Sequence, residues 1–177
     1  PNLRNVRTHR ERVDRGPGAT LFADTPTPGS NPGYGARVGS FTKATATGAQ
    51  TITHTLGAVP KAIIMWTAGS VTLDALEAGQ RMSIGFTDGT TSRSGSMASQ
   101  HNVGTSNTSR RYANALLTIV EWGEVTKAEC TFTSWSATEF VVNWTTNDGG
   151  AELIGYMVIG AAAIVASVVE WTLTTGA

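Results

Sequence analysis

The sequence predicts an all-β fold, an antiparallel β-sandwich that is jelly-roll-like and follows an extended N-terminal arm. Charged residues make up only 15% of the 177 residues, while threonine, serine, glycine and alanine are abundant. This composition favours strands and turns over long surface helices. The apolar runs are short, separated by Gly-, Asn- and Asp-bearing turns, and none shows sustained helical periodicity. A chain of this length can bury one sizeable core, so we expect one sandwich with an appendage.

The sequence divides into an arm at residues 1–39, a sandwich domain at residues 40–167, and a linker or first strand of a following repeat at residues 168–177. Residues 16–39 are rich in Gly and Pro, and proline lacks the N–H group that a sheet ladder needs. Residues 1–22 hold five arginines against two acidic residues, a net charge of +3. We expect this arm to lie across an acidic partner surface. The anchoring residues would be Arg4, Arg7, Arg10, Arg12 and Arg15.

Two strands are expected at the start of the sandwich, residues 50–56 and 61–67, divided by a turn at residues 57–60. In the first run, Ile52, His54 and Leu56 alternate with threonines, which is the pattern of a half-buried strand. His54 is therefore expected to be a structural histidine. The second run is apolar from Ala62 to Trp66, which is typical of a strand covered on both faces.

A further strand is expected at residues 81–86, with its apolar side chains Met82, Ile84 and Phe86 on one face. It follows a loop at residues 68–79 that has room for one helical turn. The Asp88-Gly89 pair after the strand predicts a turn, because glycine tolerates a positive φ.

Residues 92–111 are polar and predict either an exposed loop or an edge strand. At about twenty residues the segment is longer than an ordinary connection, and long loops on a rigid sheet often bind ligands. The candidate ligand residues are His101, Asn102, Asn107, Arg110 and Arg111.

Four closely spaced strands complete the expected sandwich, at residues 114–122, 125–135, 138–145 and 153–159. They place the following side chains inward: Ala128, Cys130, Phe132, Phe140, Val142 and Trp144. We expect one interior in which these residues converge: Ile52, Ile64, Phe86, Phe132 and Phe140.

No catalytic or metal-binding motif accompanies these strands. The three histidines lack the short spacing of a metal pair, Cys130 is the only cysteine, and no nucleophile elbow, phosphate loop or dinucleotide fingerprint occurs. The carboxylates Glu121, Glu124, Glu129 and Glu139 are interpreted as outward-facing charges. We therefore expect no enzyme and no cofactor.

Nucleic acid and membrane partners are also not expected. Thirteen basic residues balance thirteen acidic ones, whereas nucleic-acid binders usually carry basic excess. Residues 153–169 are uncharged, but they fall short of the about 20 residues of a spanning helix and contain Gly155 and Gly160.

The chain also echoes itself. Residues 38–43, VGSFTK, resemble residues 168–173, VVEWTL, and each run is followed by a short segment that ends in Gly-Ala. The match arises either by chance between two Thr-rich strands or because residue 171 opens a second copy of the domain.

The order of several segments resembles a family of tailed-bacteriophage virion proteins, often found as repeated β-rich domains. The similarity covers residues 38–175 and leaves out the arm. The segments that carry it are Ser40-Phe41-Thr42, Thr47–Ile52, Pro60–Ile64, Gly85–Thr90, Phe140–Thr145 and Tyr156–Gly160.

This resemblance implies a non-enzymatic structural protein of the virion, assembled in the host cytoplasm. A capsid-surface decoration or head-fibre component is the first expectation, and its partners would be identical subunits, for instance in a trimer, and the major capsid protein. The alternative is a tail-fibre module that binds a receptor or a host surface glycan through residues 92–111. A third alternative is a hydrolase of surface polysaccharide, which would need carboxylates clustered in a groove.

Overall fold

The computed structural model describes residues 35–160, which form ten strands and no helix. Each strand is short and bounded by turns, as the sequence predicted. The strands are β1 (Gly35–Thr42), β2 (Gly48–Thr53), β3 (Ala62–Thr67), β4 (Gln80–Thr87), β5 (Ser92–Ser99), β6 (Thr108–Ala113), β7 (Leu117–Glu121), β8 (Val125–Trp135), β9 (Glu139–Asn147) and β10 (Leu153–Gly160).

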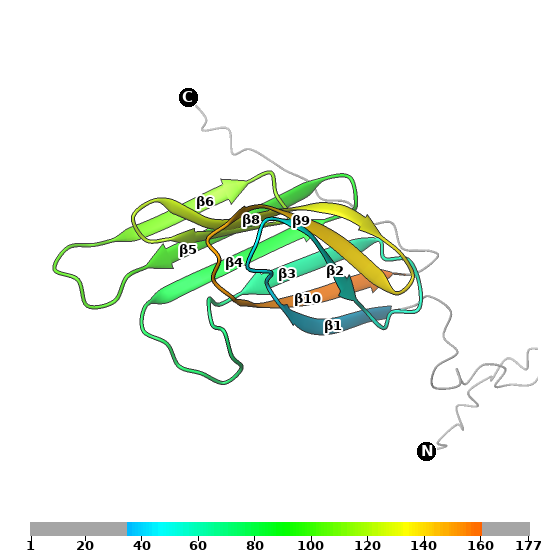
Figure 1. Cartoon of the computed structure of the whole chain (residues 1–177), viewed down its shortest axis with the longest axis horizontal. Coiled ribbons are helices and arrows are strands. Elements are labelled where there is room, and N and C mark those ends of the chain that lie inside the picture. Colours follow the sequence, from blue (N-terminus) through cyan, green and yellow to red (C-terminus); the bar gives the residue numbers. More distant parts are fainter. Residues whose placement is uncertain (1–34, 161–177) are drawn as a thin grey trace, which may run out of the picture. The chain divides into compact units, whose positions relative to one another are not determined.

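The strands form two antiparallel sheets that pack face to face (Figure 1). The larger sheet has the order β1-β10-β3-β4-β5-β6, and the smaller has the order β2-β9-β8-β7. The chain crosses between sheets after β1, β2, β6 and β9, and it forms antiparallel meanders in between. The predicted all-β antiparallel sandwich is therefore confirmed.

The sandwich begins with a strand that the sequence assigned to the arm. Residues 35–39 belong to β1, which pairs with β10 from Gly35 opposite Gly160 to Thr42 opposite Leu153. The remainder of the predicted arm, including its five arginines, lies outside the described residues, as does the segment 168–177.

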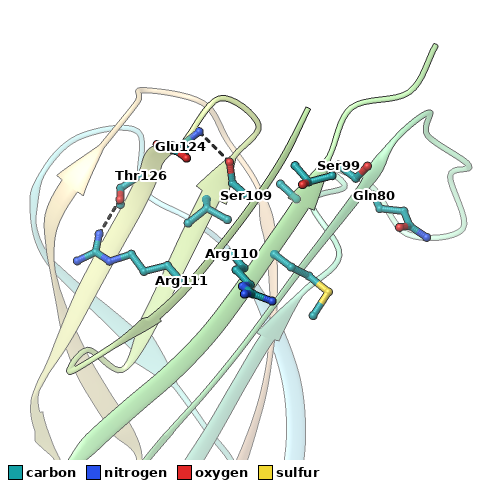
Figure 2. A pocket seen from close by; sticks show the side chains of 11 residues that line it. Gln80, Ser99, Ser109, Arg110, Arg111, Glu124 and Thr126 are labelled. Atoms are coloured by element: carbon teal, nitrogen blue, oxygen red, sulfur yellow. Dashed lines mark hydrogen bonds between the residues drawn. The ribbon is translucent and has the colours of Figure 1, made fainter. Parts of the chain in front are cut away.

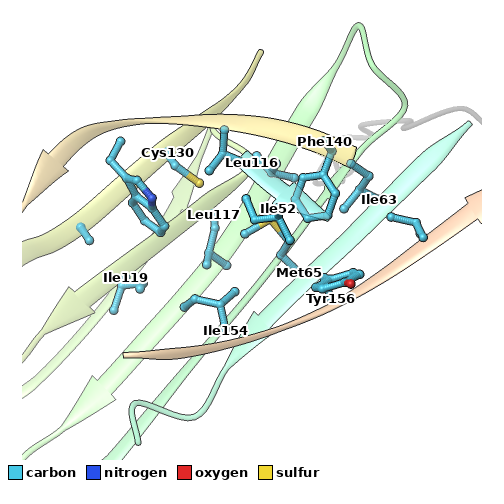
Figure 3. Packing of buried hydrophobic residues seen from close by; sticks show 14 of the residues in the cluster. Ile52, Ile63, Met65, Leu116, Leu117, Ile119, Cys130, Phe140, Ile154 and Tyr156 are labelled. Atoms are coloured by element: carbon cyan, nitrogen blue, oxygen red, sulfur yellow. The ribbon is translucent and has the colours of Figure 1, made fainter. Parts of the chain in front are cut away.

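One half of the interior is a cluster of large apolar side chains, shown in Figure 3. Ile52 on β2 lies opposite Phe140 on β9, and both are buried. The Phe140 ring packs edge-on against Tyr156 of the other sheet, with 5.2 Å between ring centroids. Val142, Trp144, Ala128 and Cys130 are also buried, as their alternation predicted. Phe132 and Trp135 pack against the margin of this cluster.

The other half of the interior is small and polar. On β4 the buried residues are Ser83, Gly85 and Thr87, whereas Met82 and Phe86 are exposed on the opposite face. The prediction that the apolar face of β4 points inward is wrong. The reason is the close approach of the two sheets: a Cβ atom on Gly85 would lie 1.7 Å from the carbonyl oxygen of Leu116.

Hydrogen bonds within and between the sheets satisfy the polar groups of this half of the interior. The hydroxyls of Ser83 and Ser96 lie 2.6 Å apart, and Ser96 Oγ accepts the Val120 N–H at 3.0 Å. Nearby, Ser94 Oγ donates to Thr118 Oγ1 at 3.0 Å. Because each buried hydroxyl has a partner, burial here carries no large desolvation cost.

The expected convergence of five residues in one interior is therefore wrong in part. Ile52 and Phe140 are in the core and Phe132 lies at its edge. Ile64 and Phe86 instead lie opposite one another on the outer side of the larger sheet. From Ala62 to Trp66 neither face of β3 is polar, so the pattern could not indicate that Ile63 and Met65 face the core while Ile64 and Trp66 face outward.

Candidate functional site

Of the two alternatives predicted for the polar segment 92–111, an exposed loop or an edge strand, the structure shows mainly strand: the segment is mostly a hairpin whose second strand lies at the sheet edge. Strands β5 and β6 pair from Ser94 opposite Ala113 to Ser99 opposite Thr108, and β6 is an edge strand of the larger sheet. The connection closes on itself, since Asn107 Nδ2 donates to Gln100 Oε1 at 2.7 Å. Only residues 100–107 form a loop.

A groove of about 930 Å³ lies beside this hairpin, between β5, β6 and the β7–β8 turn (Figure 2). Its walls carry polar groups from Gln80, Ser99, Ser109, Arg110, Glu124 and Thr126, together with apolar surface from Met97, Ala98 and Val120. The Glu124 N–H donates to Ser109 Oγ at 2.7 Å, which ties the β7–β8 turn to the edge strand. Glu124 has a φ of 63°, so this turn holds a non-glycine residue in the left-handed region.

The two arginines of the groove differ in their contacts. Arg111 donates to Thr126 Oγ1 at 2.6 Å and pairs with Glu129 Oε2 at 3.0 Å, so it links β6 to β8. Arg110 is exposed and makes no hydrogen bond or ion pair within residues 35–160. Only Arg110 therefore offers its guanidinium to a ligand.

The remaining ligand candidates do not converge on this groove. His101 lines a separate small hollow with Gly79 and Gln80, and Asn102 is exposed with a φ of 55°. The side chain of Asn107 is used within the hairpin. Of the five candidates, Arg110 and Arg111 line the groove, with their side chains leaving β6 on opposite sides, and the other three lie at the hairpin tip.

A network of buried charges at one end of the sandwich was not predicted. The fully buried Glu152 accepts a hydrogen bond from Thr67 Oγ1 at 2.8 Å. Its other carboxylate oxygen lies 3.4 Å from Lys127 Nζ and 3.7 Å from Arg81 Nη1. Arg81 also pairs with Glu121 at 2.6 Å, so the network joins β4 of the larger sheet to β7 and β8 of the smaller sheet.

The same network extends to the buried Lys43. Its ammonium group donates to Asn147 Oδ1 at 2.6 Å and lies 3.4 Å from Asp148 Oδ1. Burial by itself raises the pKa of Asp148, but the Gly150 N–H, Lys127 and Lys43 outweigh it and lower that pKa below its ordinary value.

The network is best interpreted as structural. Glu121, Glu129, Asp148 and Glu152 each contact a cation, so the interpretation of Glu121 and Glu129 as simple outward-facing charges is wrong. Within the described part of the chain, no group of three or more His, Cys, Asp or Glu side chains is placed to hold a metal ion.

The side of the larger sheet that faces away from the core is apolar; we call it the outer face. Along one row across the strands, Val38, Met157, Ile64 and Phe86 are successive neighbours, with Arg93 at the end. The next row contains Trp66 and Ile84, followed by Gly95 and Tyr112. Among residues 35–160, strand register places only two charged side chains on this face, Arg93 and Arg110 on β5 and β6.

The outer face is hollowed rather than flat. Gly95 leaves a hollow of about 460 Å³ bordered by Met82, Ile84, Met97 and Tyr112. A Cβ atom on Gly95 would meet no atom within 4 Å. A second hollow of about 470 Å³ lies on the same face near the β1 edge of the sheet. Its lining residues include Val38, Trp66 and Leu73.

Comparison of the chain with protein-family models, curated proteins and solved structures found no match. The chemistry of the surface is therefore the guide to function. No helix capable of crossing a membrane occurs among the residues that the structure describes. The two surfaces left to consider are the groove beside β6 and the outer face. The outer face had a sequence signal, the apolar alternation of Met82, Ile84 and Phe86, which was assigned to the interior instead.

Proposed function

We propose that this protein is a non-enzymatic structural component of a tailed-bacteriophage particle, a capsid-surface decoration or head-fibre subunit held by residues 1–34. The observation that supports it is the outer face. Val38, Met82, Met97 and Tyr112 are each more than half exposed there. Contiguous apolar surface of this kind is typical of proteins that pack against other proteins. The resemblance of the strand segments to virion proteins supplies the setting.

In this function the sandwich is a rigid block, and the arginines of residues 1–15 bind an acidic surface on a neighbouring virion protein such as the major capsid protein. Each arginine that reaches a carboxylate adds a charge-assisted contact, and several together can offset the entropy lost when the segment becomes ordered.

The test is the copy number of variants in purified particles, counted by quantitative mass spectrometry. Deletion of residues 1–34 leaves β1 intact, because that strand begins at Gly35. We expect the deletion to lower occupancy at least about tenfold, which corresponds to about 1.4 kcal/mol of binding free energy. Replacing all five arginines by alanine should lower it in the same direction. Undiminished incorporation of both variants would refute the anchoring role.

A second candidate function, a glycan-binding tail-fibre module, is favoured by the groove in Figure 2. Hydroxyls, the Gln80 amide and the unpaired Arg110 guanidinium can hydrogen-bond sugar hydroxyls or a sugar carboxylate. A glycan array with the full chain tests it. Saturable binding that Arg110→Ala removes, and that Lys61→Ala retains, would favour this function over the first. Lys61 is the control because it is an exposed cation outside the groove.

A further inference from the structure

The outer face is large enough to support a stable protein contact. The sheet has six strands, and five spacings of about 4.8 Å give a width of about 24 Å. Strands of six to eight residues, at about 3.3 Å per residue, give a length of about 20–26 Å. The projected area is then about 500–600 Å². Two such faces together bury about 1,000–1,200 Å². This reaches the area of about 1,000 Å² that a specific interface should exceed.

The face is also better matched by another sheet than by a single segment of chain. A segment laid across the side chains would leave its own backbone N–H and C=O groups without ladder partners. It would also cover only a band of the face. A second sheet brings its backbone groups already paired and packs at about 10 Å, over the whole width.

The charge pattern allows the partner to be an identical face. In an isologous dimer the same surface patch of both subunits forms the contact, so the patch must be chemically compatible with itself. Strand register places no charge at the centre of the outer face; Arg93 and Arg110 lie at the β5–β6 side, and Asp74 of the β3–β4 loop lines the hollow at the β1 side. A two-fold axis parallel to the strands sets this side over the partner's β1 side, where Ala36, Val38 and Ser40 carry no charge.

We propose that the outer face packs against the outer face of a second copy of this chain, as a two-fold sheet-on-sheet dimer. This inference rests on the proposed function, since it names the partner of the surface that supports it. The hollow over Gly95 gives the contact its shape, because a large apolar side chain of the partner can fill it. A trimer built as a ring is not this arrangement, because a ring joins two different patches.

The four methionines of the chain are built-in reporters of this contact. Met82, Met97 and Met157 lie on the outer face, while Met65 is fully buried in the core. Peroxide converts exposed methionine into the sulfoxide. With the full chain, we expect the three outer methionines to be protected at high protein concentration and oxidised at least about tenfold faster on dilution. Met65 should stay protected throughout.

Sedimentation velocity on the same samples gives the oligomeric state, and two variants locate the contact. Met97→Asp places a charge on the outer face, where Met97 is 57% exposed. We expect it to raise the dimer dissociation constant at least about 100-fold, since an unpaired charge would be buried in the contact. Val125→Asp is the control, because Val125 is similarly exposed, at 54%, on β8 of the other sheet.

A third variant fills the hollow. Gly95→Leu should fold normally, because its Cβ has open space, yet it should weaken the dimer.

Each contrary result overturns the inference. A monomer whose outer methionines react rapidly means that the face is open, and a monomer whose outer methionines are slow means that another segment of the same chain covers it. A trimer, or a dimer disrupted by Val125→Asp alone, places the contact elsewhere. None of these results bears on particle occupancy, which tests the proposed function separately.

Discussion

Strands β10 and β4 flank β3 in the same sheet, and they present opposite chemistry to the interior. From β10 the core receives Ile154, Tyr156 and Val158, whereas from β4 it receives Ser83, Gly85 and Thr87. The difference follows from the distance between the sheets. Beside β10 the sheets are far enough apart for the rings of Phe140 and Tyr156, but beside β4 the Leu116 carbonyl touches the strand. Where two backbones approach this closely, only small side chains fit, whatever their polarity.

The largest expected effect is on β3, the strand between β10 and β4. Two consecutive isoleucines there point to opposite faces of the sheet. Ile63 is fully buried in the core, and Ile64 is half-buried on the outer face. We expect Ile63→Ala to lower the free energy of unfolding by about 2–5 kcal/mol, because it removes buried methyl groups and leaves a cavity. Ile64→Ala should cost about 1 kcal/mol in the monomer. Urea unfolding at two protein concentrations measures both.

The concentration dependence sharpens this result. If the outer face is an interface, the cost of Ile64→Ala grows with protein concentration, whereas the cost of Ile63→Ala does not. Equal costs for the two variants at every concentration would mean that the two faces of β3 are equally buried, and the distinction drawn between them would be wrong.

The polar half is tested by two glycines on neighbouring strands. A Cβ on Gly85 would lie 1.7 Å from the Leu116 oxygen, so Gly85→Ala must push the sheets apart. We expect it to cost about 1–3 kcal/mol, as overpacking does. Gly95→Ala on β5 is the matched control, because its Cβ would meet nothing within 4 Å. It should be neutral or slightly stabilising in the monomer, since alanine loses less backbone entropy than glycine. A tolerated Gly85→Ala, measured by urea unfolding, would contradict the close approach of the sheets.

The sequence predicted the smaller sheet better than the larger one, for a physical reason. On β8 the buried residues Ala128 and Cys130 alternate with polar ones, and on β9 the buried Val142 and Trp144 flank the polar Asn143, so hydrophobicity marks the face that is inside. On β4 the outward residues Met82 and Phe86 are more hydrophobic than the inward ones. A period of two identifies the strand there but not its buried face.

The side-chain contacts at the candidate sites were even harder to predict from the sequence. Arg81 pairs with Glu121, 40 residues away, and nothing local in the sequence indicates that pair. Arg110 and Arg111 were both candidates for ligand contact, but only the structure shows that Arg111 is held by Thr126 and Glu129. Adjacent residues of a strand point to opposite sides, so their roles differ although their chemistry is the same.

The imidazole of His54, in the apolar half, provides the smallest of the expected effects. His54 is buried, as its place between Ile52 and Leu56 predicted, and its ring stacks on Phe140 with 6.4 Å between centroids. Its Nδ1 accepts the Leu56 N–H at 3.3 Å, while Nε2 makes no hydrogen bond of good geometry. Burial lowers the pKa of His54 below its ordinary 6.5, although the backbone of Ser136 and Glu139 acts in the opposite direction.

Because the folded state takes up this proton less readily than the unfolded state, the His54 contribution to stability is complete above about pH 6.5 and falls as the pH drops toward the lowered pKa. We expect His54→Gln to flatten the decline in the free energy of unfolding between about pH 7 and pH 5. His101→Gln, at the exposed hairpin tip, is the control that removes a histidine outside the core. The carboxyl of Asp148 has a lowered pKa, so its stabilising contribution is lost only below about pH 4, outside this window. If the His54→Gln profile runs parallel to that of the wild type, the ring is solvated in the folded state, and the apolar half is less tightly closed around Phe140 than its packing indicates.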